Sequence, residues 1–94
     1  MKIVINTSYG NISEESAKLR RDPKFIEDVE SGRFVGRVDE RWGMAETLRV
    51  VEIPDEITDY MIVQYDGSEM VLYCLDGNIH YTPADTDAMR IING

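Results

Sequence analysis

Two Asp-Gly pairs, Asp66-Gly67 and Asp76-Gly77, interrupt runs of alternating apolar residues in the second half of the chain. Asp-Gly in this setting is typical of a two-residue β-hairpin turn, because both turn residues must adopt a positive φ. The sequence therefore predicts a three-stranded antiparallel meander. Its strands are expected at residues 59–65, 68–75 and 78–82.

A two-residue turn also fixes which residues face each other across the strands. Tyr60 is expected opposite Tyr73, and Tyr73 opposite His80. The alternation then divides the meander into two faces. The core face is expected to carry Met61, Val63, Met70, Leu72, Cys74, Ile79 and Tyr81. The outer face is expected to carry Tyr60, Ile62, Gln64, Glu69, Val71, Tyr73, His80 and Thr82.

Helix signals stand in the first half of the chain. Ser13 is a candidate N-cap, with acidic residues in the turn after it and basic residues towards residue 21. Asp22-Pro23 is a stronger helix start, since Asp caps free N–H groups and Pro at the first helical position loses no needed donor. This second helix is expected to end at Gly32.

Runs of β-branched residues at 2–6 and 47–53 predict two further strands, the second ended by Pro54 and expected to extend the meander. Residues 33–45 are expected to form a loop or a short irregular strand. The elements together predict the α+β class. We expect one small domain, residues 1–94, in which two short N-terminal helices pack on an antiparallel β-meander of the C-terminal half.

Charge is distributed unevenly along the chain. There are 18 acidic residues against ten Lys and Arg, a formal net charge of -8, and residues 50–88 contain no lysine or arginine. A surface of one sign selects among partners and speeds their encounter. It also argues against direct nucleic-acid binding by this half, because it repels phosphates.

The carboxylates of this half allow three interpretations. The first is a solvated surface that keeps a small protein soluble. The second is a divalent-cation site at Asp85-Thr86-Asp87, whose alternate acids are spaced as in calcium loops but lack the glycine and distal glutamate of an EF-hand. The third is a phosphate-mimicking surface that occupies the basic channel of a nucleic-acid-binding protein. Its candidate residues are Asp55, Glu56, Asp59, Asp66, Glu69 and Asp76.

Tyr60, Tyr73 and His80 form a row across the predicted outer face. Three amphipathic rings side by side can stack on or hydrogen-bond a partner, so they join the candidate partner-binding residues. The alternative is cross-strand pairing that only stabilises the sheet. No Ser or Cys lies at a spacing that suggests a nucleophile for His80, so no catalytic residue is predicted and an enzyme is the less favoured class.

Cys74 is the only cysteine, which excludes an internal disulfide framework and a cysteine-based zinc site. No glycine begins a phosphate-binding loop. The apolar run at the amino terminus is too short for a signal peptide, and no segment approaches the ~18 apolar residues of a membrane span. We therefore expect no cofactor, no membrane association and a cytosolic location.

Five short blocks of the sequence are distinctive, and they occur in this order: Met1-Lys-Ile-Val-Ile-Asn6, Tyr9-Gly10, Asp22-Pro23, Val50-Val-Glu-Ile-Pro-Asp55 and Tyr65-Asp-Gly-Ser-Glu69. Together they resemble a family of small, largely uncharacterised proteins encoded by bacteriophages and prophages. The resemblance implies a viral origin and the cytosol of a host bacterium, and it implies no activity. The chain departs from the family at residues 11–13 and in the final hairpin up to Tyr81.

From these features we expect a non-enzymatic binding protein, encoded by a phage, that inhibits a host nucleic-acid-handling or defence protein of the kind that anti-CRISPR and anti-restriction proteins target. Its partner would present a basic surface. Two alternatives stay open. One is a small-ligand or nucleotide-signal binding or modifying protein that uses the aromatic row, and the other is a structural or assembly component of the virion. The sequence does not predict the oligomeric state.

Overall fold

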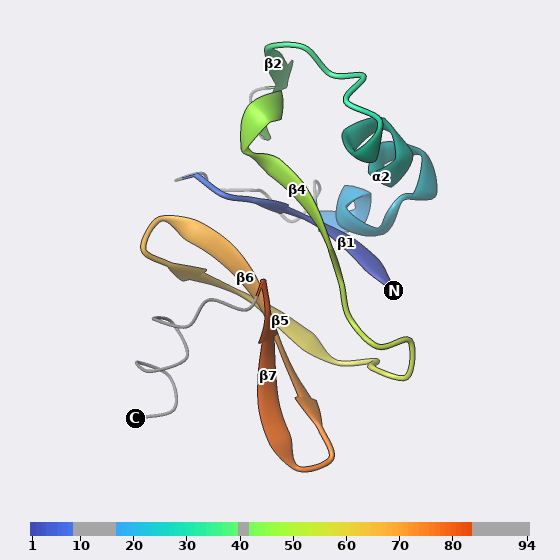
Figure 1. The fold of residues 1–94 in the computed structure, drawn as a ribbon, viewed down its shortest axis with the longest axis vertical. Coiled ribbons are helices and arrows are strands. Elements are labelled where there is room, and N and C mark those ends of the chain that lie inside the picture. Colours follow the sequence, from blue (N-terminus) through green and yellow to red (C-terminus); the bar gives the residue numbers. More distant parts are fainter. Residues whose placement is uncertain (9–16, 40–41, 84–94) are drawn as a thin grey trace.

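A computed structural model describes residues 1–8, 17–39 and 42–83. Over these residues the fold combines one α-helix, two short 3₁₀ turns and antiparallel strands in three sheets, which confirms the α+β class (Figure 1). The elements are β1 (Lys2–Asn6), η1 (Lys18–Arg21), α2 (Pro23–Glu30), β2 (Arg37–Asp39), β3 (Gly43–Met44), η2 (Ala45–Thr47), β4 (Leu48–Glu52), β5 (Tyr60–Tyr65), β6 (Ser68–Leu75) and β7 (Asn78–Thr82).

The middle layer of the fold is a two-stranded sheet of β1 and β4, with Ile3 opposite Val51 and Ile5 opposite Arg49. Both strands occur where the sequence predicts them. Strand β4 does not extend the meander, however, and this part of the prediction is wrong. Figure 1 shows α2 on one side of this sheet and the meander on the other.

The meander of β5, β6 and β7 has the predicted register throughout. Tyr60 lies opposite Tyr73 and Tyr73 opposite His80. Asp66 and Asp76 have φ values of 50° and 53°, and the glycines after them have φ values of 80° and 79°. These are the positive values that a two-residue hairpin turn needs, so turn chemistry alone explains both Asp-Gly pairs.

Helix α2 begins where Asp22-Pro23 predicts it. The Asp22 carboxylate accepts hydrogen bonds from the backbone N–H groups of Lys24 and Phe25, at 2.9 and 3.4 Å. Gly32, with φ 69°, follows its end. The helix expected from Ser13 lies partly outside the described residues, and its described end is the 3₁₀ turn η1 rather than an α-helix. Arg37–Asp39 and Gly43–Met44 form the small irregular pair β2–β3.

Alternation along β1 creates two cores, one on each face of the middle sheet. Val4 points to the helix side, where it packs with Phe25, Ile26, Trp42 and Leu48. Ile3 and Ile5 point to the meander side, where they pack with Val51, Ile53, Ile57 and Val71. Full burial of such a side chain contributes about 1.5–3 kcal/mol, so both faces of this short sheet stabilise the fold.

The structure reverses the predicted faces of the meander over most of their length. The face that packs on β1 and β4 carries Val71, which is 0% exposed, and the half-buried Tyr60, Ile62 and Tyr73. On the face predicted to be the core, Met61 and Ile79 are 62% and 52% exposed, and Cys74 is exposed. Only Met70 and Tyr81 of that set are buried, in a small separate cluster. Below, the inner face is the one on β1 and β4, and the outer face is the opposite one.

Candidate functional site

Four of the predicted partner-binding carboxylates are exposed at one end of the meander. Asp59 directly precedes β5, whose first residue lies opposite Tyr73, and Asp76 lies in the turn after β6. Asp55 and Glu56 lie in the connection from β4 to β5, which Figure 1 shows on the same side of the molecule as that turn. We call Asp55, Glu56, Asp59 and Asp76 the acidic end.

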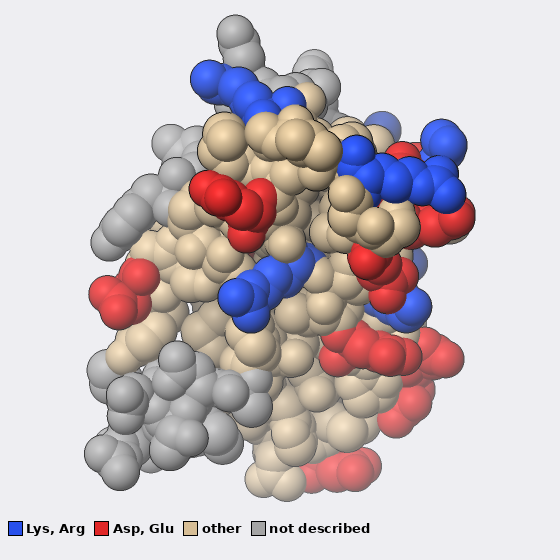
Figure 2. Space-filling view, turned by 45° about the horizontal axis from the view of Figure 1, so that its top comes forward, with Lys and Arg blue, Asp and Glu red and all other residues tan. Residues whose placement is uncertain are grey.

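The acidic end is poor in compensating charge. Among the described residues, Glu56, Asp59 and Asp76 take part in no ion pair, whereas Asp55 pairs with the amino terminus of Met1. The hydrogen bond that the Met1 amine donates to Asp55, and the positive charge of this amine, lower the pKa of the Asp55 carboxyl. Figure 2 shows acidic side chains along the lower right margin, below the lysines and arginines of the first half.

Asp66 is exposed but lies away from this group. The two turns close opposite ends of β6, so the full length of Ser68–Leu75 separates Asp66 from Asp76. A partner that covers the acidic end therefore does not need to reach Asp66. The structure does not bring the six predicted carboxylates together on one surface.

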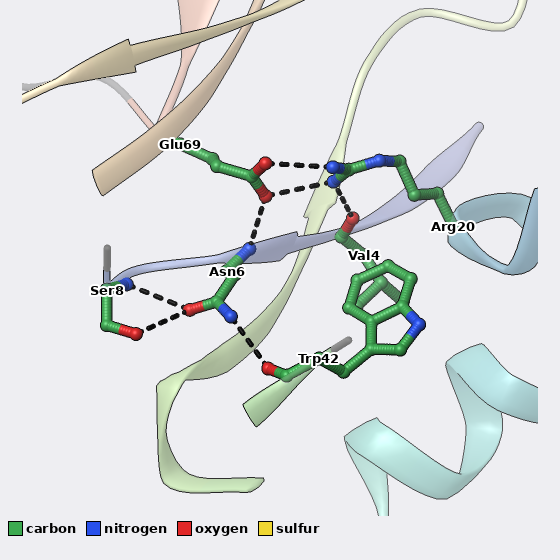
Figure 3. Close-up of polar contacts among 6 residues, drawn as sticks. All are labelled: Val4, Asn6, Ser8, Arg20, Trp42 and Glu69. Atoms are coloured by element: carbon green, nitrogen blue, oxygen red, sulfur yellow. Dashed lines mark hydrogen bonds and ion pairs between the residues drawn. The ribbon is translucent and has the colours of Figure 1, made fainter. Parts of the chain in front are cut away.

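Glu69 is not a surface residue, and the expectation that it binds a partner through an exposed carboxylate is wrong. It is 4% exposed and lies on the inner face of β6. Both of its oxygens accept hydrogen bonds from the guanidinium of Arg20, at 2.9 and 2.8 Å (Figure 3). A buried charge needs such a partner, because losing its hydration costs several kcal/mol. The role of Glu69 is therefore structural.

The Arg20–Glu69 pair closes the edge of β1 that β4 leaves open. The odd-numbered residues Met1 and Thr7 make their backbone hydrogen bonds on the β4 side of β1. Because these bonds alternate along an antiparallel strand, the backbone groups of the even-numbered residues point to the other edge. There Arg20 Nη1 donates to the Val4 carbonyl at 3.0 Å, and the Asn6 N–H donates to Glu69 Oε1 at 2.7 Å. Side chains thus satisfy edge groups that would otherwise be buried without partners.

Two neighbours hold this pair in place (Figure 3). The Arg20 guanidinium lies 5.3 Å from the centre of the Trp42 ring, within the range of a cation–π contact. The side-chain amide of Asn6 donates to the Trp42 carbonyl at 2.7 Å. Sequence reasoning missed the whole network. Its only signal was an acid that directly precedes two apolar residues of the same strand, Met70 and Val71.

The aromatic row keeps its predicted pairing but not its predicted exposure. The Tyr73 and His80 rings stack with centroids 5.5 Å apart and planes inclined by 15°. Tyr60 and Tyr73 pack against the core between the meander and the middle sheet, and only His80 is exposed. The row therefore stabilises the sheet and offers a partner little beyond the imidazole.

The described residues contain no group of three or more His, Cys, Asp or Glu side chains that could hold a metal ion. Asp85-Thr86-Asp87, the predicted alternative cation site, lies outside them. No helix in the described ranges is both long and apolar enough to cross a lipid bilayer. No protein-family model, curated protein or solved structure matches this chain.

Proposed function

We propose that this chain is a non-enzymatic binding protein that inhibits a host nucleic-acid-handling or defence protein by covering its basic surface. The acidic end is the contact region. One observation carries the proposal: Glu56, Asp59 and Asp76 are exposed together at one end of the meander, without a cation partner among the described residues. The resemblance to phage and prophage proteins supports a target in the host cytosol.

The physical basis is electrostatic. A protein that binds nucleic acid lines its channel with Lys and Arg, which a surface of carboxylates can occupy in place of phosphates. The net charge of -8 adds long-range attraction towards such a channel. Hairpin geometry also favours this surface, since Asp76 sits in a turn of fixed backbone conformation and loses little freedom on binding.

The ligand-binding alternative has less support. It requires Tyr60, Tyr73 and His80 to form an open stacking surface, and the two tyrosines pack against the inner core. His80 is exposed, but its ring already stacks on Tyr73. A flat ligand would find only one free face of one ring.

The test is capture from a host bacterial lysate by the immobilised protein at low and at high salt. We expect bound proteins to be nucleic-acid-binding, to bind less tightly in molar salt, and to be displaced by added DNA, because screening weakens contacts between exposed charges. The control is a variant with Asp55, Glu56, Asp59 and Asp76 changed to their amides, which should capture none of them. Capture that this variant retains, or that DNA does not displace, contradicts the proposal.

A further inference from the structure

The outer face of the meander is hollowed next to the acidic end. Register places Met61 opposite Leu72 on neighbouring strands, and Cys74 opposite Ile79. These four side chains line a shallow groove of about 270 Å³, and Asp59 lies at its rim. Three strands thus contribute to one apolar depression that reaches the acidic end.

This groove is costly to leave in water. Of the four large apolar side chains that the described residues leave exposed, Met61 and Ile79 share it. Covering apolar side chains that are grouped in one hollow is favourable, because it removes their surface from water. The other two, Val35 and Met44, share a second hollow in the first half of the chain, which Glu46 also lines. There Val35 lies between Arg33 and Arg37 in the sequence.

The charge at the rim identifies the occupant. Asp59 lines the groove, and Asp76 lies in the turn between the strands that carry Cys74 and Ile79; neither has an ion-pair partner within the described part of the chain. In a partner segment, a lysine or arginine would pair with these carboxylates, and an apolar side chain next to it would pack into the groove. A second copy of this chain would instead place the same carboxylates against each other, which disfavours self-association here.

We propose that the groove of Met61, Leu72, Cys74 and Ile79 receives a polypeptide segment of the partner in which apolar side chains alternate with Lys or Arg. This inference rests on the proposed function and adds the part of the contact that salt does not screen. The carboxylates of the acidic end attract and orient the partner, and the groove then holds its apolar side chains.

A pair of short synthetic peptides tests this. One alternates lysine with leucine, and the other alternates lysine with serine, so they carry equal charge. The leucine peptide should bind the full chain more tightly, and the double variant Met61→Ser/Ile79→Ser should weaken it by about tenfold or more. The matched variant Val35→Ser/Met44→Ser removes two exposed apolar groups elsewhere and should leave binding unchanged.

Cys74 supplies a second readout in the unaltered protein. It is exposed, and no other cysteine is present, so alkylation by N-ethylmaleimide reports on the groove alone. We expect bound leucine peptide to slow this reaction several-fold. Failure of the leucine peptide to bind, or binding that leaves the alkylation rate unchanged, overturns the groove as the contact.

The two proposals fail in different ways. If Met61→Ser/Ile79→Ser has no effect but Asp59→Asn/Asp76→Asn abolishes binding of both peptides, the groove proposal is wrong and the acidic end remains. If the peptides bind equally well after Asp59→Asn/Asp76→Asn and in molar salt, the proposed function itself is contradicted.

Discussion

Arg20 and Glu69, 49 residues apart in the chain, form a doubly hydrogen-bonded ion pair between η1 and β6 across the open edge of β1. The pair connects the helical side of the fold to the meander that presents the acidic end. It also replaces a neighbouring strand, since its atoms bond to the edge groups of Val4 and Asn6. The acid that sequence reasoning assigned to the binding surface therefore holds that surface in position.

Removing both partners of the pair should cost less than the two single removals together. Glu69→Ala leaves the Arg20 charge buried and should lower the free energy of unfolding by about 3–5 kcal/mol. The double variant Arg20→Met/Glu69→Leu buries no charge but leaves the edge groups of Val4 and Asn6 unpaired, so it should lose less than the sum of the Arg20→Met and Glu69→Leu losses. Urea denaturation measures each loss. A loss in the double variant equal to the sum of the two single losses would show that the pair is not coupled.

The inner and outer faces of β6 should respond differently to truncation. Val71→Ala removes two methyl groups from a side chain that is 0% exposed, and should cost roughly 1.5–3 kcal/mol of unfolding free energy. Cys74→Ala on the exposed outer face should change it by less than about 0.5 kcal/mol. A larger loss from Cys74→Ala than from Val71→Ala would show that the face with Cys74 is the buried one, as the sequence predicted.

Both hairpin turns should tolerate asparagine and resist β-branched residues. At φ values of 50° and 53°, Asp66→Asn and Asp76→Asn keep a residue that accepts the left-handed conformation. Asp66→Val and Asp76→Val should each cost about 1–2 kcal/mol, measured by denaturation. Similar stability of the Val and Asn variants would contradict the turn assignment.

Asp55 should titrate below the ordinary pKa of an aspartate in a chain with a free Met1 amine. The hydrogen bond and charge of that amine lower the Asp55 pKa, so its stabilising contribution is present above the ordinary aspartate pKa and is lost as pH falls through the lowered value. Carboxyl NMR titration measures the Asp55 midpoint. Formylation of the amine should raise this midpoint towards the ordinary aspartate value, and an unchanged midpoint would contradict the pairing.

Local signals predicted the local parts of this fold. The Asp-Gly turns determined the register of the meander, and Asp22-Pro23 determined the start of α2, because each depends on residues close together in sequence. The pairing of β1 with β4 was not predictable in this way. Lys2 and Glu52 are far apart in the chain, and no turn chemistry connects them.

The reversed faces of the meander have a similar cause. Period-two alternation shows which residues share a face but does not show which face is covered. Here both faces are apolar: Ile62 and Val71 stand on one, and Met61 and Leu72 on the other. The polar Glu69 made the inner face look like the outer one, and only the distant Arg20 allows it to be buried.

The most direct test of the proposed function compares two double variants of equal charge. Asp59→Asn/Asp76→Asn alters the acidic end and Asp66→Asn/Glu46→Gln alters exposed acids elsewhere, and each pair takes the net charge from -8 to -6. Affinity for the captured partner, measured at low salt, should fall about tenfold or more for the first pair and little for the second. Equal losses would show that only total charge matters, and the acidic end would then not be the binding surface.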